Sequence, residues 1–556
     1  YPVRATAFPT HLTAAAGGVP TFHLLPGLPL APAFGFAGDR EAAGELSLVL
    51  ELPKGVTLRQ ACYLHPGMRQ ALPLKDEAAS TGEPPCQRFR LPVPARVIGR
   101  TEPVWASVLA TFLEPQPGFT RGELVYWLEG RAGNSARSTV QLVALPALPA
   151  APRPRAFELF PWYQMTLSCP DPAVRAAQVA ALEQLGARTT SYHGLDKQVA
   201  RELKARGWKL VLGMGWSDRG PYGFQLHNYG RIDWSQRGYP EEVWIVDHRG
   251  QRHVGVFCPS YAAARGPLFV KEYRGWLGEL IDAEARELCA VLSNDFEPGE
   301  TGLMGARHSC FCERCRLEFA ARIKAEPATI PDAAAILGGH LAAWTDYRMD
   351  LYARLIGFHT DVARELAPGM VNSICSHWVP DPPGAEIWPG EAIDVRRFDP
   401  YADQHTPMMY HGGTRLLDNL ERTRQHLTKP LLVLTAAFYD AWSSSTVVFS
   451  PAEVRWNLVG IGSHGAAGAG FYASLDHCDG AYLHAIQAAL ADLARLEDDL
   501  AGTPVAAAVT GLGSNARAYR RRRAGRELVA LFNADGRQAA TAQLSVPDGW
   551  RAIDAL

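Results

Sequence analysis

Several features are missing from this chain of 556 residues, and each absence excludes a class of protein. No run of about 20 apolar residues is free of polar interruption, so we expect no membrane-spanning helix. An excess of one charge is also missing, because 55 Lys and Arg face 57 Asp and Glu and leave a net charge of −2. A nucleic-acid-binding protein or a polybasic membrane-binding protein would carry a basic excess. We therefore expect neither a nucleic-acid partner nor a membrane partner.

Cysteine is scarce, and the common nucleotide and esterase motifs are missing. Ten cysteines in 556 residues are too few for a disulfide-stapled scaffold. No G-x-G-x-x-G or Walker loop follows a predicted strand, which argues against a nucleotide-binding doubly wound sheet. No G-x-S-x-G elbow is present, which argues against acyl transfer.

The sequence divides into three regions by pattern. Residues 1–152 contain short apolar runs at 46–52, 104–112 and 124–128, separated by Gly and Pro turns, and predict an antiparallel β-sandwich. This region ends in a proline-rich spacer at 145–154. Residues 503–556 hold two short apolar runs with Gly and Asp turns, which predict a small C-terminal β module.

Between these regions, residues 153–502 alternate short apolar runs with amphipathic stretches. The predicted strands are 157–163, 188–192, 210–214, 289–295, 370–376, 407–411, 431–437 and 469–473. The predicted helices are 172–185, 199–206, 332–366, 416–426 and 481–500. Eight strands in strand–helix alternation predict the α/β class and a (β/α)8 TIM barrel, with insertions at the hairpin-like segment 243–256 and the cysteine loop 307–315.

The start of the chain bears on localisation. It begins at Tyr1, without the basic and apolar segments of a signal peptide, which predicts a processed or trimmed form. With the sandwich module, this favours a secreted or periplasmic protein. A homo-oligomer is left open.

A cluster of thiols indicates a metal site. Cys310, Cys312 and Cys315 follow the spacing C-x-C-x-x-C, which lets three sulfurs converge on one ion at about 2.3 Å. Cys258, at the start of a loop after an extended segment, is the best candidate for the fourth ligand, and His308 is the reserve. We expect a structural Zn²⁺, because all-sulfur sites are usually closed to substrate.

Carboxylates follow the predicted strands, where barrel enzymes place their chemistry. Asp295 and Glu297 are two residues apart at the end of the fourth strand, so both point the same way. A neighbouring carboxylate raises the pKa of a carboxylic acid, which suits Glu297 as general acid. A glycosidase needs a second carboxylate, and Asp440 is the first candidate and Asp476 the second.

Aromatic and polar side chains gather at the same strand ends. Flat aromatic faces with polar rims are what sugar rings stack on. The candidate substrate-binding residues are Trp162, Tyr163, Tyr192, His193, Trp216, Asn294, Trp378, Tyr410, His411, Tyr439, Trp442 and Asp476.

One stretch resembles a known family. The segment C-P-S-Y from Cys258, the strand ending N-D-F-E at Glu297 and the cysteine triplet resemble glycoside hydrolase family 42, the zinc-containing β-galactosidases. The resemblance covers about residues 255 to 320. It implies zinc on Cys258 together with the triplet, and Glu297 as acid/base. The seventh predicted strand ends in Asp440, where that family has a glutamate. The chain therefore resembles the family as a distant relative would.

These features predict a glycoside hydrolase that cleaves a poly- or oligosaccharide, with β-galactosides as one candidate substrate. Two alternatives remain. In a substrate-assisted N-acetylhexosaminidase, Glu297 would protonate the leaving oxygen and Asp295 would orient the substrate acetamido group. In a non-catalytic carbohydrate-binding barrel, the zinc scaffold would persist without a nucleophile.

Overall fold

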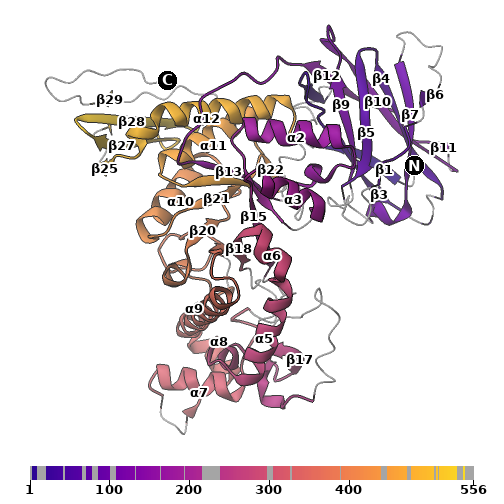
Figure 1. Ribbon diagram of the computed structural model, residues 1–556. Coiled ribbons are helices and arrows are strands. Elements are labelled where there is room, and N and C mark those ends of the chain that lie inside the picture. The colour runs from indigo at the N-terminus through magenta and orange to yellow at the C-terminus, as the bar shows by residue number, and fades with distance from the viewer. Residues whose placement is uncertain are drawn as a thin grey trace. The chain divides into compact units, whose positions relative to one another are not determined.

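The computed structural model divides the chain into two compact units. One unit comprises Tyr1–Trp208, Tyr410–Leu417 and Leu434–Leu556, and the other comprises Lys209–Met409 and Asp418–Val433 (Figure 1). The structure describes residues 3–8, 20–39, 41, 44–64, 70–74, 76–77, 86–99, 108–131, 133–162, 164–192, 195–215, 238–296, 305–325, 329–387, 390–439, 447–472, 478–505, 509–510, 512–534 and 543–544.

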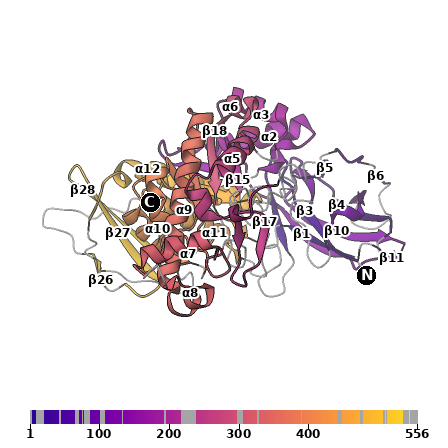
Figure 2. The ribbon, with the colours of Figure 1, turned by 90° about the horizontal axis from the view of Figure 1, so that it is seen from below.

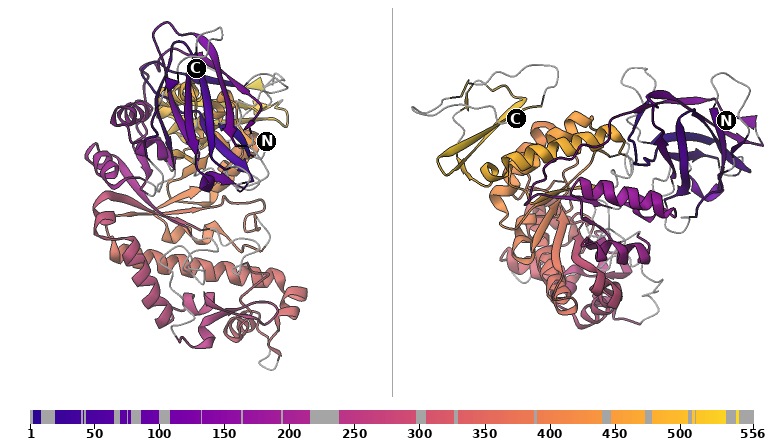
Figure 3. Two further views of the ribbon diagram at one scale, coloured as in Figure 1. Left: turned by 90° about the vertical axis from the view of Figure 1, so that its right-hand side faces the viewer. Right: turned by 45° about the horizontal axis from the view of Figure 1, so that its top comes forward.

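The N-terminal part of the first unit consists of two mostly antiparallel sheets, whose strands lie side by side in Figure 3 (left). The first sheet has the order β1-β3-β9-β5, with β8 paired to β3: β1 (Val3–Phe8), β3 (Ala33–Gly38), β5 (Val56–Tyr63), β8 (Ile98–Gly99) and β9 (Leu109–Pro115). The second has the order β2-β12-β10-β4-β7-β6, with β11 paired to β10: β2 (Thr21–Leu24), β4 (Leu46–Pro53), β6 (Asp76–Glu77), β7 (Cys86–Val93), β10 (Arg121–Gly130), β11 (Gly133–Asn134) and β12 (Ser138–Ala144).

Alternation along the strands explains how these sheets bury one face. In β7, Phe89, Leu91 and Val93 are buried while the residues between them are exposed, as a period of two requires. The two sheets meet where Phe34 on β3 contacts Tyr126 on β10, with ring centroids 5.0 Å apart in an edge-to-face arrangement.

The remainder of the first unit combines strands with helices. Its elements are β13 (Glu158–Trp162), α2 (Pro172–Gln184), β14 (Thr189–Ser191), α3 (Lys197–Ala205), β22 (Phe438–Tyr439), β23 (Val447–Val448), α11 (Pro451–Ser463), β24 (Gly468–Tyr472) and α12 (Gly480–Leu500). Strands β13 and β24 pair in parallel. Helices α11 and α12 pack closely at Gly462. A Cβ at this position would lie 2.4 Å from the Leu493 side chain, so a larger residue would not fit without a shift.

Short strands complete the first unit at its C-terminal end. They are β25 (Thr503–Val505), β26 (Val509–Thr510), β27 (Ala516–Arg523), β28 (Arg526–Asn533) and β29 (Gln543–Leu544). Strands β27 and β28 form an antiparallel hairpin next to α12 (Figure 3, right).

The second unit is built on parallel strands in the order β15-β18-β19-β20. These are β15 (Lys209–Gly215), β18 (Cys289–Asp295), β19 (Val371–Ser376) and β20 (Gln404–Pro407). The hairpin of β16 (Trp244–Val246) and β17 (Arg252–Phe257), and the helices α4 (Pro259–Ala263), α5 (Pro267–Leu280), α6 (Ala283–Leu288), α7 (Glu313–Arg322), α8 (Ala333–Gly339) and α9 (Leu341–Leu366), connect them. Helices α7 and α8 lie beside α9 (Figure 2). Helix α10 (Gly413–His426) and strand β21 (Leu432–Thr435) contain residues of both units.

Parallel strands joined by helices confirm the predicted α/β class, whereas closure of eight strands into one barrel stays a prediction. The strand at 289–295 and the hairpin at 243–256 are found where the sequence predicts them. The helix predicted over 332–366 is interrupted at His340, which follows two glycines that end α8.

The sixth predicted strand is displaced. The sequence predicts 407–411, whereas β20 covers Gln404–Pro407. Its buried positions carry polar side chains whose partners lie on other segments. The His405 Nε2 is 3.0 Å from the Asp399 Oδ1, and the Thr406 hydroxyl is 2.9 Å from that of Ser373. An apolar-run criterion therefore misses this strand, and Tyr410 and His411 lie beyond its end.

Candidate functional site

Four cysteine sulfurs come together in the second unit. The Sγ atoms of Cys258, Cys310, Cys312 and Cys315 all lie within 4.8 Å of one another. The Cys258 Sγ is 3.5 Å from the sulfurs of both Cys312 and Cys315. A zinc ion about 2.3 Å from four tetrahedral sulfurs would set them about 3.8 Å apart, so the spacing fits.

Three segments place these sulfurs. Cys258 directly precedes α4, and its backbone N–H donates to the carbonyl of Val243 at 2.8 Å. Cys312 directly precedes α7, and Cys315 lies in the first turn of that helix. The Val246 N–H, at the end of β16, donates to the Cys310 Sγ at 3.4 Å. The hairpin, the cysteine loop and α7 therefore all converge on one point.

His308, the reserve ligand, lies outside this group. Its carbonyl accepts a hydrogen bond from the His248 N–H at 2.9 Å, and the two imidazole rings meet edge to face at 5.8 Å. Among the described residues, the group of metal-ligand side chains is the four cysteines.

The thiols influence each other's protonation. Burial raises the pKa of Cys258 and of Cys315. Hydrogen bonds from Cys258, Cys310 and Cys315 lower the pKa of Cys312. Without a cation, these shifts favour the thiol form at Cys258 and Cys315 and the thiolate form at Cys312. A soft divalent cation would stabilise all four thiolates, which is the donor chemistry that zinc prefers.

A cavity reaches this cluster on one side. It has a volume of about 490 Å³, and its lining includes Cys312, His248, Arg249 and Arg316. Cys312 is the partly exposed member of the four cysteines. Solvent and small chelators therefore have a route to one sulfur.

The carboxyl end of β18 carries two candidate residues. Asn294 is fully buried and Asp295 is partly buried. Asp295 pairs with Gly215 of β15 and with Cys375 of β19, so neighbouring strands flank it on both sides. The next residue, Phe296, donates its N–H to the Cys375 carbonyl at 2.8 Å, which holds the chain against β19 immediately before Glu297.

A buried histidine–carboxylate pair lies at the carboxyl end of the neighbouring strand β19. The Nε2 of His377 is 2.7 Å from the Oε2 of Glu391, and the two residues are 3% and 7% exposed. Neither residue is among the candidates predicted from the sequence. The position of His377 directly after a strand was an available signal. The sequence around Glu391 gives no such signal, because only the folding of a long loop brings Glu391 to His377.

The candidate aromatic residues differ in how much surface they expose. Trp162 is 3% exposed and packs on Phe160, and Trp378 is 9% exposed beside His377, so little of either ring is open to a ligand. Tyr410 contacts Tyr472, with ring centroids 5.8 Å apart.

The remaining candidates are distributed as follows. Burial, and secondarily the Arg415 charge, lowers the pKa of His411 to about 4, so its imidazole is neutral at pH 7. Tyr192 directly follows β14 and is partly buried, and the backbone of Tyr439 ends β22. Of the candidates, Trp162, Tyr192, Tyr410, His411 and Tyr439 belong to the first unit, and Asn294, Asp295, Trp378 and the four cysteines to the second. Outside the described residues lie Tyr163, His193, Trp216, Glu297, Asp440, Trp442 and Asp476.

Comparison with known proteins gives distant structural similarity. No protein-family model and no curated protein matches the chain. A β-galactosidase from Marinomonas ef1 is 12% identical over 63% of this chain and 62% of its own, with a TM-score of 0.44. One from Halorubrum lacusprofundi is 13% identical over 63% and 60%, with a TM-score of 0.44. A family 42 β-galactosidase from G. stearothermophilus, in the form of a catalytic mutant, is 13% identical over 63% of this chain and 58% of its own, with a TM-score of 0.41.

The chain is thus similar, at a distance, to β-galactosidases that include family 42 enzymes. It matches less than two thirds of the length of each of them. A function for this chain therefore has to rest on its own residues. Among the described helices, none has both the length and the apolar character that crossing a bilayer requires.

Proposed function

We propose that the chain is a glycoside hydrolase acting on a poly- or oligosaccharide, with β-galactosides as the first substrates to test. The observation that carries the proposal is the position of Asp295 at the carboxyl end of β18, between two parallel neighbours and two residues before Glu297. Parallel α/β sheets bind their ligands at this edge.

In this proposal Glu297 is the general acid that protonates the departing glycosidic oxygen. Asp295, as a neighbouring negative charge, raises the pKa of Glu297 and keeps the proton available near neutral pH. Asp440 is the second carboxylate. It acts as nucleophile if the two carboxyl groups are about 5–5.5 Å apart, and as base for a water if they are about 6.5–9.5 Å apart.

The Asp-x-Glu spacing also favours a second mechanism. Here Asp295 orients a 2-acetamido group of the substrate, whose oxygen attacks the anomeric carbon while Glu297 protonates the leaving oxygen. This mechanism predicts N-acetylhexosaminides as substrates and little effect of Asp440→Asn. The two mechanisms therefore differ in substrate and in their dependence on Asp440.

We further propose that the four cysteines hold a structural Zn²⁺. The sulfur spacing and the thiolate-stabilising donor set support this assignment. The cysteine loop is tied to the segment after β19, because the Ala306 N–H donates to the Gly390 carbonyl at 2.6 Å and Trp344 on α9 donates to the Ala306 carbonyl at 2.7 Å. Zinc would therefore stabilise the surroundings of the strand ends.

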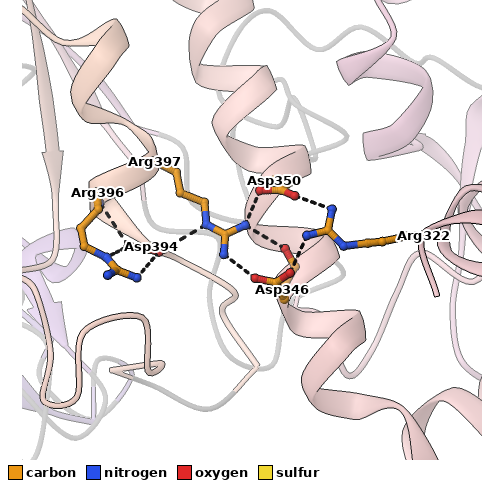
Figure 4. Close-up of polar contacts among 6 residues, drawn as sticks. All are labelled: Arg322, Asp346, Asp350, Asp394, Arg396 and Arg397. Atoms are coloured by element: carbon orange, nitrogen blue, oxygen red, sulfur yellow. Dashed lines mark hydrogen bonds and ion pairs between the residues drawn. The ribbon is translucent and has the colours of Figure 1, made fainter.

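A network of alternating arginines and aspartates links α7, α9 and the segment 394–397 (Figure 4). Arg322, at the end of α7, bonds to Asp346 and Asp350 on α9, and both aspartates also bond to Arg397. Arg397 in turn bonds to Asp394 at 3.3 Å. Burial alone would raise the pKa of Asp346, but the two arginines hold it below its ordinary value. The proposed zinc at its start and Arg322 at its end would thus fasten helix α7 at both ends.

The proposal is tested with a panel of p-nitrophenyl glycosides and polysaccharides, using the wild type, Glu297→Gln and the matched control Glu279→Gln. Glu279 lies exposed on α5. We expect Glu297→Gln to lose about 10²–10⁴-fold in kcat and Glu279→Gln to match the wild type. Full activity in Glu297→Gln would contradict its role as acid. If no glycan is cleaved by the wild type, the hydrolase proposal fails in favour of a carbohydrate-binding protein.

A further inference from the structure

A fully buried arginine lies beside the four-cysteine site. Arg348, in the N-terminal half of α9, is 0% exposed. Burying a charge is costly unless opposite charge and hydrogen bonds compensate for it. A guanidinium remains protonated in a protein interior, so this position carries a permanent positive charge.

Arg348 donates a hydrogen bond directly to the cysteine loop. Its Nη1 donates to the Ser309 carbonyl at 2.7 Å, and its Nη2 donates to the Tyr352 hydroxyl at 2.7 Å. Both of these acceptors are neutral oxygens. Ser309 immediately precedes Cys310, so the guanidinium is anchored to the backbone that presents one of the sulfurs.

Two of the cysteines act electrostatically on Arg348. Burial works against the charged guanidinium, yet the phenol of Tyr352 and the sulfurs of Cys315 and Cys310 outweigh it and raise the pKa of Arg348. Four thiolates around a divalent ion leave a net charge of about −2 inside the protein. One buried cation in hydrogen-bond contact with the loop would offset half of that charge.

We propose that Arg348 is the internal counter-cation of the four-cysteine site and that its charge, more than its hydrogen bonds, sets the affinity of the site for a divalent metal. This inference rests on the proposed metal site and is independent of the glycosidase activity. Each ion stabilises the other: the thiolates compensate a buried guanidinium, and the guanidinium favours the thiolate form that binds metal.

Two variants separate charge from hydrogen bonding. Arg348→Lys keeps the charge and loses the planar fork, whereas Arg348→Gln loses the charge and keeps an N–H donor for the Ser309 carbonyl. Arg364→Met is the matched control, because Arg364 is on the same helix with a side chain that is 50% exposed and pairs with Asp403. Circular dichroism of each full-length variant checks that it is folded.

The readout is metal affinity, measured by zinc competition with a chromogenic chelator and by the thiolate charge-transfer and d–d bands of the Co²⁺-loaded protein. We expect Arg348→Gln to bind about 10–100-fold more weakly than the wild type, Arg348→Lys to recover most of the loss, and Arg364→Met to be unchanged. Equal losses in the Lys and Gln variants, or no loss in either, would overturn the proposal.

Two further outcomes are also informative. If Arg348→Gln does not fold, Arg348→Lys alone decides, because a loss greater than about 10-fold there contradicts a role based on charge. A wild type that binds neither Zn²⁺ nor Co²⁺ overturns the metal site itself, and the Arg348 inference with it, but leaves the test of Glu297 unaffected.

Discussion

Phe296 connects the candidate acid to the interior of its unit, so replacing it tests how Glu297 is positioned. The Phe296 side chain is fully buried, and its ring meets Tyr352 at 5.3 Å and Phe398 at 5.5 Å, edge to face in both cases. Its N–H is bonded to β19 through the Cys375 carbonyl. Because Glu297 is the next residue, loosening Phe296 displaces the acid.

The structure sets the size of the effect. Phe296→Ala removes a buried ring, which costs about 3–5 kcal/mol in unfolding free energy. Phe296→Leu retains much of the volume but loses two aromatic contacts worth about 0.5–1.5 kcal/mol each, so we expect about 1–3 kcal/mol. A displacement of about 1 Å at a reacting group costs about 10²-fold in rate, so kcat falls more than KM rises.

Three assays measure these effects: urea unfolding followed by tryptophan fluorescence, amide exchange in β18, and aryl glycoside hydrolysis. Leu317→Ala is the control, because Leu317 is 45% exposed on α7 and its loss should change the free energy of unfolding by less than about 0.5 kcal/mol. The reasoning is refuted if Phe296→Ala costs less than about 1 kcal/mol. It is also refuted if stability falls while kcat stays at the wild-type level.

Three further predictions follow from the second unit. Removing metal with a chelator should lower the thermal midpoint and the helical ellipticity, and added Zn²⁺ should restore both; an unchanged midpoint in a protein shown to release zinc would contradict a structural role. Burial lowers the pKa of His359 to about 3, below the ordinary value of about 6.5, so the neutral form stabilises the fold above pH 6.5 and this contribution is lost as the pH falls toward 3. His359→Gln should therefore show a shallower loss of unfolding free energy over that range, by about one proton per molecule, and an unchanged slope would disprove the assignment. Arg397→Met should lower the free energy of unfolding by about 1 kcal/mol and reduce its dependence on NaCl, whereas Arg354→Met, which removes a more exposed arginine of α9, should have less effect.

The local sequence pattern was sufficient to predict a strand where an apolar segment is flanked by polar residues. Strand β18 coincides with its prediction at both ends, because its apolar run ends in the polar residues Asn294 and Asp295. The cysteine cluster was predictable in its triplet for a different reason. Three thiols within six positions can reach one ion without help from a distant segment, and Cys258 was identified by its position after a strand.

Buried polar residues and long loops are the reasons why other parts of the fold and the site could not be predicted from the sequence. Strand β20 buries His405 and Thr406, whose partners Asp399 and Ser373 lie on other segments, so its sequence has no apolar signature. The His377–Glu391 pair depends on a loop of 13 intervening residues, whose conformation no local pattern specifies.

Buried charge was equally hidden from the sequence. Arg348 lies on a long amphipathic helix among other arginines, and only the packing of α9 against the cysteine loop distinguishes it from its exposed neighbours. Its contribution therefore depends on tertiary contacts that are not encoded in the helix itself.

The central claim, that Glu297 protonates the leaving oxygen, is tested most directly by the leaving-group dependence of hydrolysis. The kcat/KM of the wild type and of Glu297→Gln would be compared on a sugar that the wild type cleaves, linked to dinitrophenol, p-nitrophenol or an alkyl alcohol. An acidic phenol leaves without protonation, so the account predicts a small loss for the dinitrophenyl glycoside and a loss of about 10²–10⁴-fold for the alkyl glycoside. An equal loss for all three substrates, or no loss for any, would contradict the assignment of Glu297 as the acid.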